Sequence, residues 1–326
     1  MEKIYLPQYD QETENQRQVE LYFLGTGAGM PSRHRNVTSL ALNLLAERGE
    51  FWLFDCGEGT QQQILRSPVK LSRTEKLFIS HMHGDHIYGI PGLLTSRSYL
   101  GGETPVTLYG PKGIRSYVDS VLQLSQAHLT YELRVVEIET EGILFDDESF
   151  QVEVARLEHR VESFGFRIVE KDQPGKLQQE RLQAMGIPPG PLYGRLKQGK
   201  TVRLDDGTEL NGHDFVGERV AGRKVVILGD TKYCRGALHL ARGADVLVHE
   251  ATFDMSRQEL ANAYDHATSI DAARTAREAG AKVLIMTHIS SRFQEEGAQL
   301  LVQEARSIHA ESYLAQDFWS YAVERG

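Results

Sequence analysis

The chain has 326 residues, of which 40% are hydrophobic, so it can bury a substantial core in one large or two ordinary domains. Its apolar runs are far shorter than the roughly 20 residues that cross a bilayer, and Met1-Glu2-Lys3 does not begin a secretion signal. We therefore expect a cytoplasmic protein without a membrane span. The two cysteines, Cys56 and Cys234, lie outside any CxxC pair, which argues against a disulfide framework or a thiolate metal site.

Charge is unevenly distributed along the chain. The formal net charge of −9 disfavours a protein that coats nucleic acid with a general basic surface. Residues 167–203, however, contain eight basic and three acidic side chains, which gives this segment a charge of +5 and leaves −14 on the rest of the chain.

Residues 171–200 are also rich in Gly and Pro and have too little apolar content for a core of their own, so they should protrude. Such a segment fits one localised polyanion contact, although a solvated charged arm has the same composition.

Short apolar runs bounded by Gly, Asp or His predict buried strands in both halves of the chain. They cover residues 21–24, 51–54 and 76–79 in the first half and 225–228, 246–248 and 283–286 in the second. Polar residues follow the C-terminal end of each run, which indicates a duplicated half. Residues 145–157 alternate like an antiparallel strand around a bend near Asp146-Asp147.

Helices are predicted between the strands. Apolar residues recur at helical spacing from 114 to 122. Residues 269–279 are rich in Ala, with Thr268 or Ser269 as the N-terminal cap and Gly280 as the stop. We therefore expect mixed strands and helices, with the helices covering sheets.

The strongest chemical signal is His81-Met82-His83-Gly84-Asp85-His86, directly after an apolar run. Residues two apart point the same way from extended backbone, so His81 and His83 could hold one ion while Asp85 and His86 turn toward a second. A solvated histidine-rich turn is the alternative, but clustered His and Asp at a strand end are typical of a metal site.

Three more candidate ligands follow apolar runs elsewhere in the chain: His159, Asp230 and His288. Taken singly, each of these residue types is more often structural than ligating. Their joint arrangement with the first cluster favours ligation.

Gly25-Thr26-Gly27-Ala28-Gly29 follows a strand as a dinucleotide-binding loop does, but residues 30–36 do not continue as an amphipathic helix. We expect a tight turn beside the metals instead. Its backbone could approach a substrate phosphate with Arg33 or Arg35 nearby, or it could serve packing alone.

The candidate ligands together resemble the metallo-β-lactamase superfamily, in the pattern His81-x-His83-x-Asp85-His86, His159, Asp230 and His288. Further motifs resemble the ribonuclease Z family (short-form tRNase Z): Gly229-Asp230-Thr231, Val248-His249-Glu250-Ala251-Thr252-Phe253, His266-Ala267-Thr268 and Thr287-His288-x-Ser290-x-Arg292. The ending Ser290-Ser291-Arg292-Phe293 is similar to the bacterial form called ribonuclease BN. The resemblance runs from about Leu21 to the C-terminus and departs at Ala267, where the family usually has Ser.

This resemblance implies an α/β fold, the metallo-β-lactamase αββα four-layer sandwich, as one domain over residues 1–326 with a protruding flexible exosite arm inserted at 168–203. It also implies two Zn²⁺ per subunit. The implied ligands are His81, His83 and His159 for one ion, Asp85, His86 and His288 for the other, and Asp230 for both. Imidazoles with carboxylates suit Zn²⁺, although Mn²⁺ or Co²⁺ is compatible with the same ligands.

The implied activity is endonucleolytic removal of the 3′ trailer of precursor tRNA, leaving a 3′-hydroxyl on the tRNA, with additional 3′ exonuclease activity left open. In the family the enzyme is a homodimer, and we expect no DNA partner. Asp85 would orient the nucleophile or accept its proton, and His266, held by Glu250, would protonate the departing oxygen. A purely structural hydrogen-bonded pair is the alternative for Glu250 and His266.

Fold and metals alone do not name a substrate. Gly190-Pro191-Leu192-Tyr193-Gly194-Arg195 resembles the ribonuclease Z exosite, which in that family clamps the tRNA elbow, and basic side chains there suit phosphate contacts that read shape. Two rival functions stay open. One is a small-molecule phosphodiesterase acting on cyclic nucleotides through the same site, and the other is a catalytically inert, metal-bearing RNA-binding module.

Overall fold

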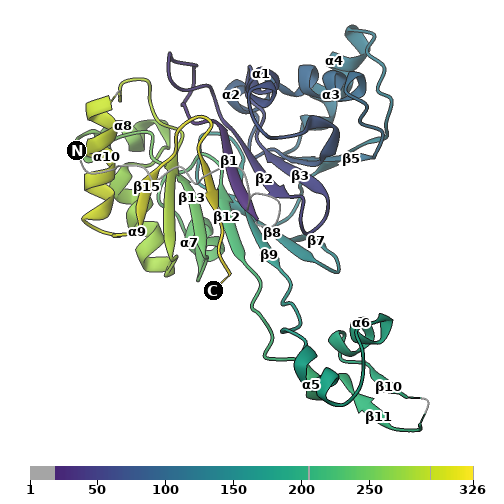
Figure 1. Ribbon diagram of the computed structural model, residues 1–326. Coiled ribbons are helices and arrows are strands. Elements are labelled where there is room, and N and C mark those ends of the chain that lie inside the picture. Colours follow the sequence, from purple (N-terminus) through teal and green to yellow (C-terminus); the bar gives the residue numbers. More distant parts are fainter. Residues whose placement is uncertain (1–18, 205, 294, 326) are drawn as a thin grey trace. The chain divides into compact units, whose positions relative to one another are not determined.

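The computed structural model describes residues 19–204, 206–293 and 295–325 (Figure 1). They form two compact units, a larger one that runs to Val169 and resumes over Lys224–Glu324, and a smaller one over Glu170–Arg223 with Arg325. In the part of the chain described, none of the helices has both the length and the apolar character that spanning a membrane requires.

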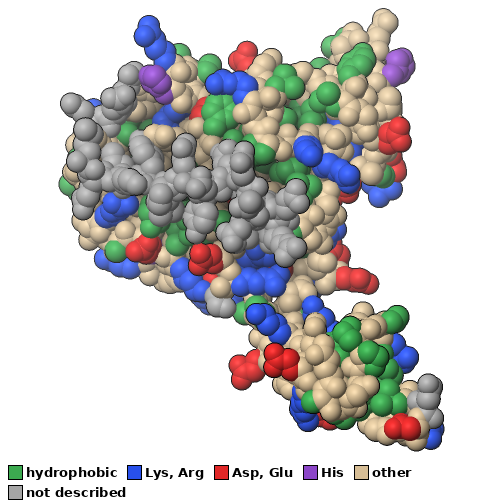
Figure 2. Space-filling view, viewed as in Figure 1, with side chains coloured by type: hydrophobic (Ala, Val, Ile, Leu, Met, Phe, Trp, Pro, Cys, Tyr) green, Lys and Arg blue, Asp and Glu red, His purple; other side chains and the backbone are tan. Residues whose placement is uncertain are grey.

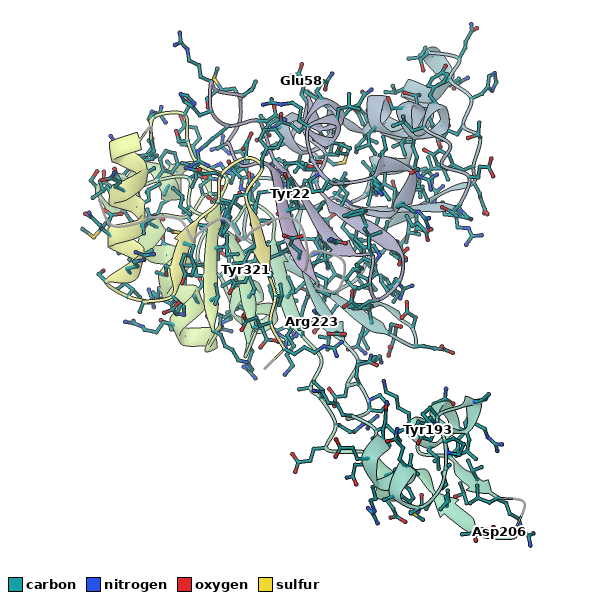
Figure 3. The ribbon with its side chains drawn as sticks, in the orientation of Figure 1. Tyr22, Glu58, Tyr193, Asp206, Arg223 and Tyr321 are labelled. Atoms are coloured by element: carbon teal, nitrogen blue, oxygen red, sulfur yellow. The ribbon has the colours of Figure 1, made fainter. Side chains whose placement is uncertain are left out.

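Within the described residues, the larger unit contains two seven-stranded sheets. The first has the order β16-β1-β2-β3-β4-β5-β6. Its strands are β1 Glu20–Gly25, β2 Ser39–Leu44, β3 Glu50–Phe54, β4 Thr74–Phe78, β5 Val106–Gly110, β6 Leu133–Glu137 and β16 Ser320–Ala322. β3 to β6 run parallel, whereas β16, β1, β2 and β3 pair antiparallel. Tyr22 and Tyr321, labelled in Figure 3, come from the neighbouring strands β1 and β16.

The second sheet repeats this succession with the order β15-β14-β13-β12-β9-β8-β7. Its strands are β7 Gly142–Asp146, β8 Phe150–Leu157, β9 Ser163–Glu170, β12 Lys224–Leu228, β13 Val246–Glu250, β14 Val283–Thr287 and β15 Ser312–Leu314. β12 to β15 run parallel, and β9 and β7 pair antiparallel with β12 and β8. The duplicated half is therefore confirmed. So is the bend near Asp146-Asp147, where β7 turns into β8.

Helices cover the outer faces of both sheets (Figure 1). The helices of the larger unit are α1 Thr60–Leu65, α2 Gly84–Ile87, α3 Ile90–Tyr99, α4 Ile114–Leu124, α7 Arg235–Ala241, α8 Gln258–Tyr264, α9 Ser269–Ala279 and α10 Glu295–Arg306, with 3-10 turns η1 Leu71–Arg73 and η3 Met255–Arg257. The predicted ends of α9 are confirmed. Thr268 and Asp271 form a capping box, and Gly280 ends the helix at a φ of 66°.

Three hydrophobic layers hold these elements together, which confirms the four-layer αββα sandwich. Phe54 and Phe78 of the first sheet pack against Phe166 of the second in the central layer. One outer layer packs α1, α3 and α4 on the first sheet, and the other packs α7, α9 and α10 on the second. Strands such as β3 and β13 are buried at every position, which explains why they read as continuous apolar runs.

The smaller unit has a core of its own, so the prediction that this segment is too polar to build one is wrong. Its elements are α5 Gln179–Ala184, α6 Pro191–Lys197, β10 Thr201–Arg203, β11 Glu209–Asn211 and the 3-10 turn η2 Gly212–Phe215. Leu182, Leu196 and Phe215 are buried together in it. The unit extends to Arg223 instead of ending at residue 203, because β10 pairs with β11 and the chain closes only where Glu170 N–H donates to Arg223 O at 2.8 Å.

The central aromatic layer makes a stability prediction. Phe78 is fully buried and its ring centroid lies 4.8 Å from that of Phe54 and 5.4 Å from that of Phe166. We expect Phe78→Ala to lower the free energy of unfolding by about 3–5 kcal/mol, because it leaves a cavity between the sheets. The control is Ile143→Ala on β7, where the side chain is 62% exposed and the expected change is below about 0.5 kcal/mol. Denaturant unfolding followed by circular dichroism measures both, and equal effects would contradict this role of the layer.

Candidate metal centre

The candidate ligands converge where the C-terminal ends of strands from both sheets meet. His81, His83, Asp85 and His86 follow β4, whereas His159 follows β8, Asp230 follows β12 and His288 follows β14. Gly229 allows the two halves to approach here, since a Cβ added to it would lie 2.5 Å from Ser80 Cβ and 2.8 Å from Phe164 O. The structure thus brings together all seven residues that the sequence analysis singled out as ligands.

One group of donor atoms consists of His81, His83, His159 and Asp230. His83 Nδ1 lies 3.1 Å from His81 Nε2 and 3.2 Å from His159 Nε2, and His81 Nε2 lies 3.6 Å from Asp230 Oδ2. Tetrahedral zinc with Zn–N distances of about 2.0–2.1 Å places its ligand atoms about 3.3–3.4 Å apart. The donor spacing therefore fits one such ion.

A second group consists of Asp85, His86 and His288. Asp85 Oδ2 lies 3.3 Å from His288 Nε2 and 3.5 Å from His86 Nε2. Asp230 Oδ2 lies 3.2 Å from His288 Nε2 and 3.5 Å from His86 Nε2, as well as beside His81 of the first group. Asp230 is thus the carboxylate common to both groups.

Asp55 and Ser80 fix the imidazoles of the first half. Asp55 Oδ2 accepts from His86 Nδ1 at 2.8 Å and from Ser80 Oγ at 2.8 Å, and Ser80 Oγ in turn lies 2.9 Å from His81 Nδ1. These bonds leave Nε2 of His81 and His86 as acceptors that face the cluster. The role of Asp55 was not predicted from the sequence, and its position directly after the apolar run 51–54 was the available signal.

Thr252 and Asp265 act in the same way in the second half, and neither role was predicted from the sequence. Thr252 Oγ1 donates to Glu250 Oε2 at 2.6 Å and accepts from His288 Nδ1 at 2.9 Å. The backbone oxygen of Asp265 accepts from His159 Nδ1 at 2.8 Å. A backbone acceptor has no side-chain signature, so only the fold reveals it.

Burial and charge in the cluster suit a cation. Burial and the neighbouring imidazole of His86 hold the pKa of His81 well below its usual range, which keeps it in the neutral form that metals bind. Burial opposes ionisation of Asp230, but the surrounding His288, His86 and His81 outweigh it and hold the pKa of this carboxyl well below its usual range. Among the described residues, His86 Nε2 is one of the few buried side-chain atoms without a hydrogen-bond partner. A divalent ion would satisfy it.

Glu250 and His266 form a hydrogen-bonded pair beside the cluster. Glu250 Oε1 accepts from His266 Nδ1 at 2.8 Å and from Thr231 N–H at 2.8 Å. Burial disfavours the imidazolium, but Glu250 outweighs burial and raises the pKa of His266 to about 9. The His266 ring centroid lies 5.0 Å from that of His159 and 5.4 Å from that of His288, so this imidazole borders both groups of donors.

The glycine-rich loop between β1 and β2 also reaches the cluster, as expected for a turn beside the predicted metal site. Gly29, with a φ of 70°, donates its N–H to Asp85 Oδ2 at 2.8 Å. Arg35 does not extend toward a substrate from here, because its side chain is 9% exposed and donates to Thr26 Oγ1 and Ala315 O. Arg33 is exposed.

Comparisons with known proteins agree with this geometry. The family model of the anti-Pycsar protein Apyc1 matches residues 19–173. Ribonuclease Z of Geobacillus kaustophilus (strain HTA426) is 58% identical over 308 residues, which cover 94% of this chain and 100% of that protein. The crystal structure of human tRNase Z, short form, has a TM-score of 0.68 at 32% identity and covers 94% of this chain and 99% of its own. The metallo-β-lactamase fold protein YhfI from Bacillus subtilis shares the fold, with a TM-score of 0.64 at 18% identity over 93% and 99% of the two chains. Since the identity to ribonuclease Z extends over nearly the whole chain, this protein belongs to the ribonuclease Z family, metal-dependent endoribonucleases of the metallo-β-lactamase fold.

Proposed function

We propose that this chain is a cytoplasmic, zinc-dependent endoribonuclease that removes the 3′ trailer of precursor tRNA and leaves a 3′-hydroxyl on the tRNA. The observation that carries the proposal is the convergence of seven His and Asp side chains into two donor groups that share Asp230, in a chain 58% identical to a ribonuclease Z. The human relative is a tRNase Z, which names tRNA as the substrate class. An inert RNA-binding module would not need this donor set.

The donor set supports two Zn²⁺ per subunit. His81, His83 and His159 would hold one ion, Asp85, His86 and His288 the other, and Asp230 both. Two divalent ions bound there would lower the pKa of a water molecule and neutralise charge on a scissile phosphate. Three of the imidazoles are buried and their remaining nitrogens are hydrogen-bonded, so the donors are oriented before any ion arrives.

The chain's own residues handle the protons. Asp85 Oδ2 faces the cluster and can orient the attacking water or accept its proton. His266 borders the cluster with Nδ1 held by Glu250, which leaves Nε2 to donate a proton to the departing oxygen. Nearby cations would lower the pKa of His266 from about 9 toward neutrality, where a general acid is most effective.

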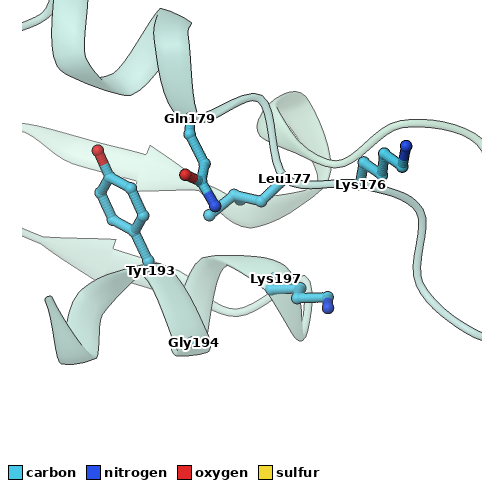
Figure 4. Close-up of a pocket in the computed structure, with 6 residues that line it drawn as sticks. All are labelled: Lys176, Leu177, Gln179, Tyr193, Gly194 and Lys197. Atoms are coloured by element: carbon cyan, nitrogen blue, oxygen red, sulfur yellow. The ribbon is translucent and has the colours of Figure 1, made fainter. Parts of the chain in front are cut away.

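The smaller unit supports recognition of the tRNA away from the cut. It contains a pocket of about 330 Å³ lined by Lys176, Leu177, Gln179, Tyr193, Gly194 and Lys197 (Figure 4). Residues 170–223 hold nine basic and eight acidic side chains, so the unit as a whole is nearly neutral. Attraction of a polyanion would therefore depend on where the basic side chains lie and not on the net charge of the unit. Figure 2 shows both kinds on its surface. Two lysines and an aromatic ring that line one pocket suit contacts with a phosphate backbone.

A homodimer is part of the proposal. Large hydrophobic side chains are exposed on the helices that cover the first sheet, namely Leu65 of α1, Tyr99 of α3 and Leu124 of α4, together with Tyr88 and Leu100. Exposed apolar side chains on helices that contact one another, as α3 contacts α1 and α4, suit an interface. Members of the family pair the arm of one subunit with the active site of the other, and we propose the same division of labour here.

The activity predicts a metal-dependent cleavage product. Purified protein with two Zn²⁺ per subunit should cut a precursor tRNA carrying a 3′ trailer once, at the trailer junction. Removal of the ions with a chelator should abolish cleavage, and Zn²⁺, Mn²⁺ or Co²⁺ should restore it to different extents, because the donors suit all three. Mapping of product ends by primer extension and mass spectrometry checks the site and the 3′-hydroxyl. Hydrolysis of cyclic nucleotides without any cleavage of precursor tRNA would contradict the proposed substrate.

The proton-donor role of His266 predicts a kinetic effect without loss of metal. His266→Ala should lower kcat by about 10²-fold or more, the usual contribution of a general acid. In the wild type, kcat should fall as pH rises through the pKa of His266, because only the imidazolium donates, and this alkaline decline should disappear in the variant. Metal content measured by atomic emission should stay at the wild-type value. His239→Ala, which removes an exposed imidazole paired with Glu153, is the control and should leave kcat unchanged.

The recognition role of the smaller unit predicts a substrate-dependent loss. Replacing residues 171–222 by a two-residue turn is feasible, because Glu170 N–H donates directly to Arg223 O at 2.8 Å. The variant should lose at least about 10²-fold in kcat/KM for precursor tRNA, as expected for removal of a whole phosphate-contacting surface, and keep its hydrolysis of a small aryl phosphodiester. An equal loss on both substrates would show damage to the fold and would count against this role.

A further inference from the structure

The loop between β1 and β2, residues 26–38, contacts Asp85, the carboxylate that the proposed reaction uses to orient the attacking water. Gly29 donates its N–H to Asp85 Oδ2 at 2.8 Å. The same oxygen lies 3.3 Å from His288 Nε2, so the amide and the ligand cluster approach one oxygen of Asp85. The orientation of this carboxylate therefore depends on where the loop holds the Gly29 amide.

A second carboxylate, that of Asp317, accepts hydrogen bonds from both ends of this loop. Its Oδ1 accepts from Thr26 N–H at 3.1 Å and from Thr26 Oγ1 at 2.7 Å. Its Oδ2 accepts from Asn36 N–H at 2.7 Å and from Gln63 Nε2 at 2.9 Å. Thr26 and Asn36 lie near the two ends of the loop, and Gln63 belongs to α1. A single side chain thus joins both ends of the loop to a helix.

Buried partners keep Asp317 in place. Arg35 Nη1 donates to Thr26 Oγ1 at 2.6 Å and to Ala315 O at 2.6 Å, which ties the loop to the segment that carries Asp317. Phe318 N–H donates to Phe23 O at 2.7 Å and fixes that segment against β1. The carboxylate is therefore part of a fully bonded polar network, in which each member constrains the others.

We propose that Asp317 is a positioning residue for the hydrolytic reaction: by clasping Thr26 and Asn36 it fixes the Gly29 N–H on Asp85 Oδ2 and so fixes the orientation of the Asp85 carboxylate. The inference rests on the proposed function for the role of Asp85. Asp317 lies 232 positions from Asp85 in the sequence. Its proposed effect is on the chemical step and is separate from metal binding and from tRNA binding.

The loop has other bonds that survive a change at Asp317. Gly27 N–H donates to Asn36 O at 2.8 Å, and Ala28 N–H donates to Ile289 O at 3.1 Å. Loss of the Asp317 bonds should therefore loosen the loop without detaching it. Asp317→Asn suits the test, because both carboxylate oxygens of Asp317 accept from N–H donors. In either orientation of the asparagine amide, its NH₂ group faces one of these donors and cannot accept from it.

Amide hydrogen exchange tests the structural half of the proposal without any substrate. In the metal-loaded and the metal-free protein, Asp317→Asn should speed exchange at Thr26, Gly29 and Asn36 by about tenfold or more, since each loses or loosens a bond to a charged acceptor. The matched control is Asp147→Asn at the β7–β8 turn, where Asp147 accepts from Ser149 N–H and Phe150 N–H at 2.9 Å each. It lies at the opposite end of β8 from His159 and should leave the loop unchanged.

Kinetics test the functional half. Asp317→Asn should lower kcat about tenfold on both precursor tRNA and a small aryl phosphodiester, because a misplaced reacting group costs rate on every substrate. KM for precursor tRNA and the number of bound Zn²⁺ should stay unchanged, and Asp147→Asn should leave kcat within about twofold of the wild type. Gly29→Ala strains the backbone at a φ of 70°, so it should also lower kcat. The kcat of the double variant Asp317→Asn/Gly29→Ala should then be about that of the slower single variant, because both substitutions act through one hydrogen bond.

The proposal is overturned by unchanged exchange at Gly29 in Asp317→Asn, by a fall in kcat no larger than that of Asp147→Asn, or by multiplied effects in the double variant. Loss of Zn²⁺ from Asp317→Asn would also overturn it, since the role would then be in metal binding. A wild-type protein that hydrolyses the aryl diester but leaves precursor tRNA intact contradicts the proposed substrate instead, and the comparison of Asp317→Asn with Asp147→Asn on the diester still decides the inference.

Discussion

The structure depends on the convergence of five imidazoles and two carboxylates at one point between two sheets, where His81, His86, His288 and Asp230 are buried. Asp230 Oδ2 lies within 3.2–3.6 Å of Nε2 of His81, His86 and His288. Removing ionisable groups from water is unfavourable unless they are paired or coordinate a cation. Because the first sheet supplies four of the donors and the second supplies three, the cluster exists only when the two halves are packed together. Folding and metal binding are therefore linked.

Each half orients its donors with one carboxylate and one hydroxyl. In the first half, Asp55 binds His86 directly and His81 through Ser80. In the second half, Glu250 binds His266 directly and His288 through Thr252. The two arrangements correspond, and both end at possible donor atoms: His81 and His86 in the first half, and in the second His288 and His266, which form a further group with Asp230. Repetition of a half thus accounts for the matched hydrogen bonds that orient imidazoles on both sides of the cluster.

How much the sequence could predict depended on whether the information was local. The buried strands, α9 with its cap at Thr268, and the ligand motif after β4 all follow from residues close together in the chain, and the structure has them where they were expected. The core of the smaller unit was missed, because Leu182, Leu196 and Phe215 stand singly among polar residues and meet only after two short helices and a hairpin form. The roles of Asp55, Thr252 and the Asp265 carbonyl were missed for the same reason, since each depends on a partner far along the chain.

The backbone segments that begin and end the smaller unit are tightly bonded to each other. Glu170 N–H donates to Arg223 O, and the buried Glu170 carboxylate pairs with Arg223 and Arg325, so the chain leaves and re-enters the sandwich on adjacent, tightly bonded backbone. β9 and β12 then continue in register from Val169 and Lys224. Asp230 lies just beyond the far end of β12, so changes within residues 171–222 do not alter the register that places this ligand.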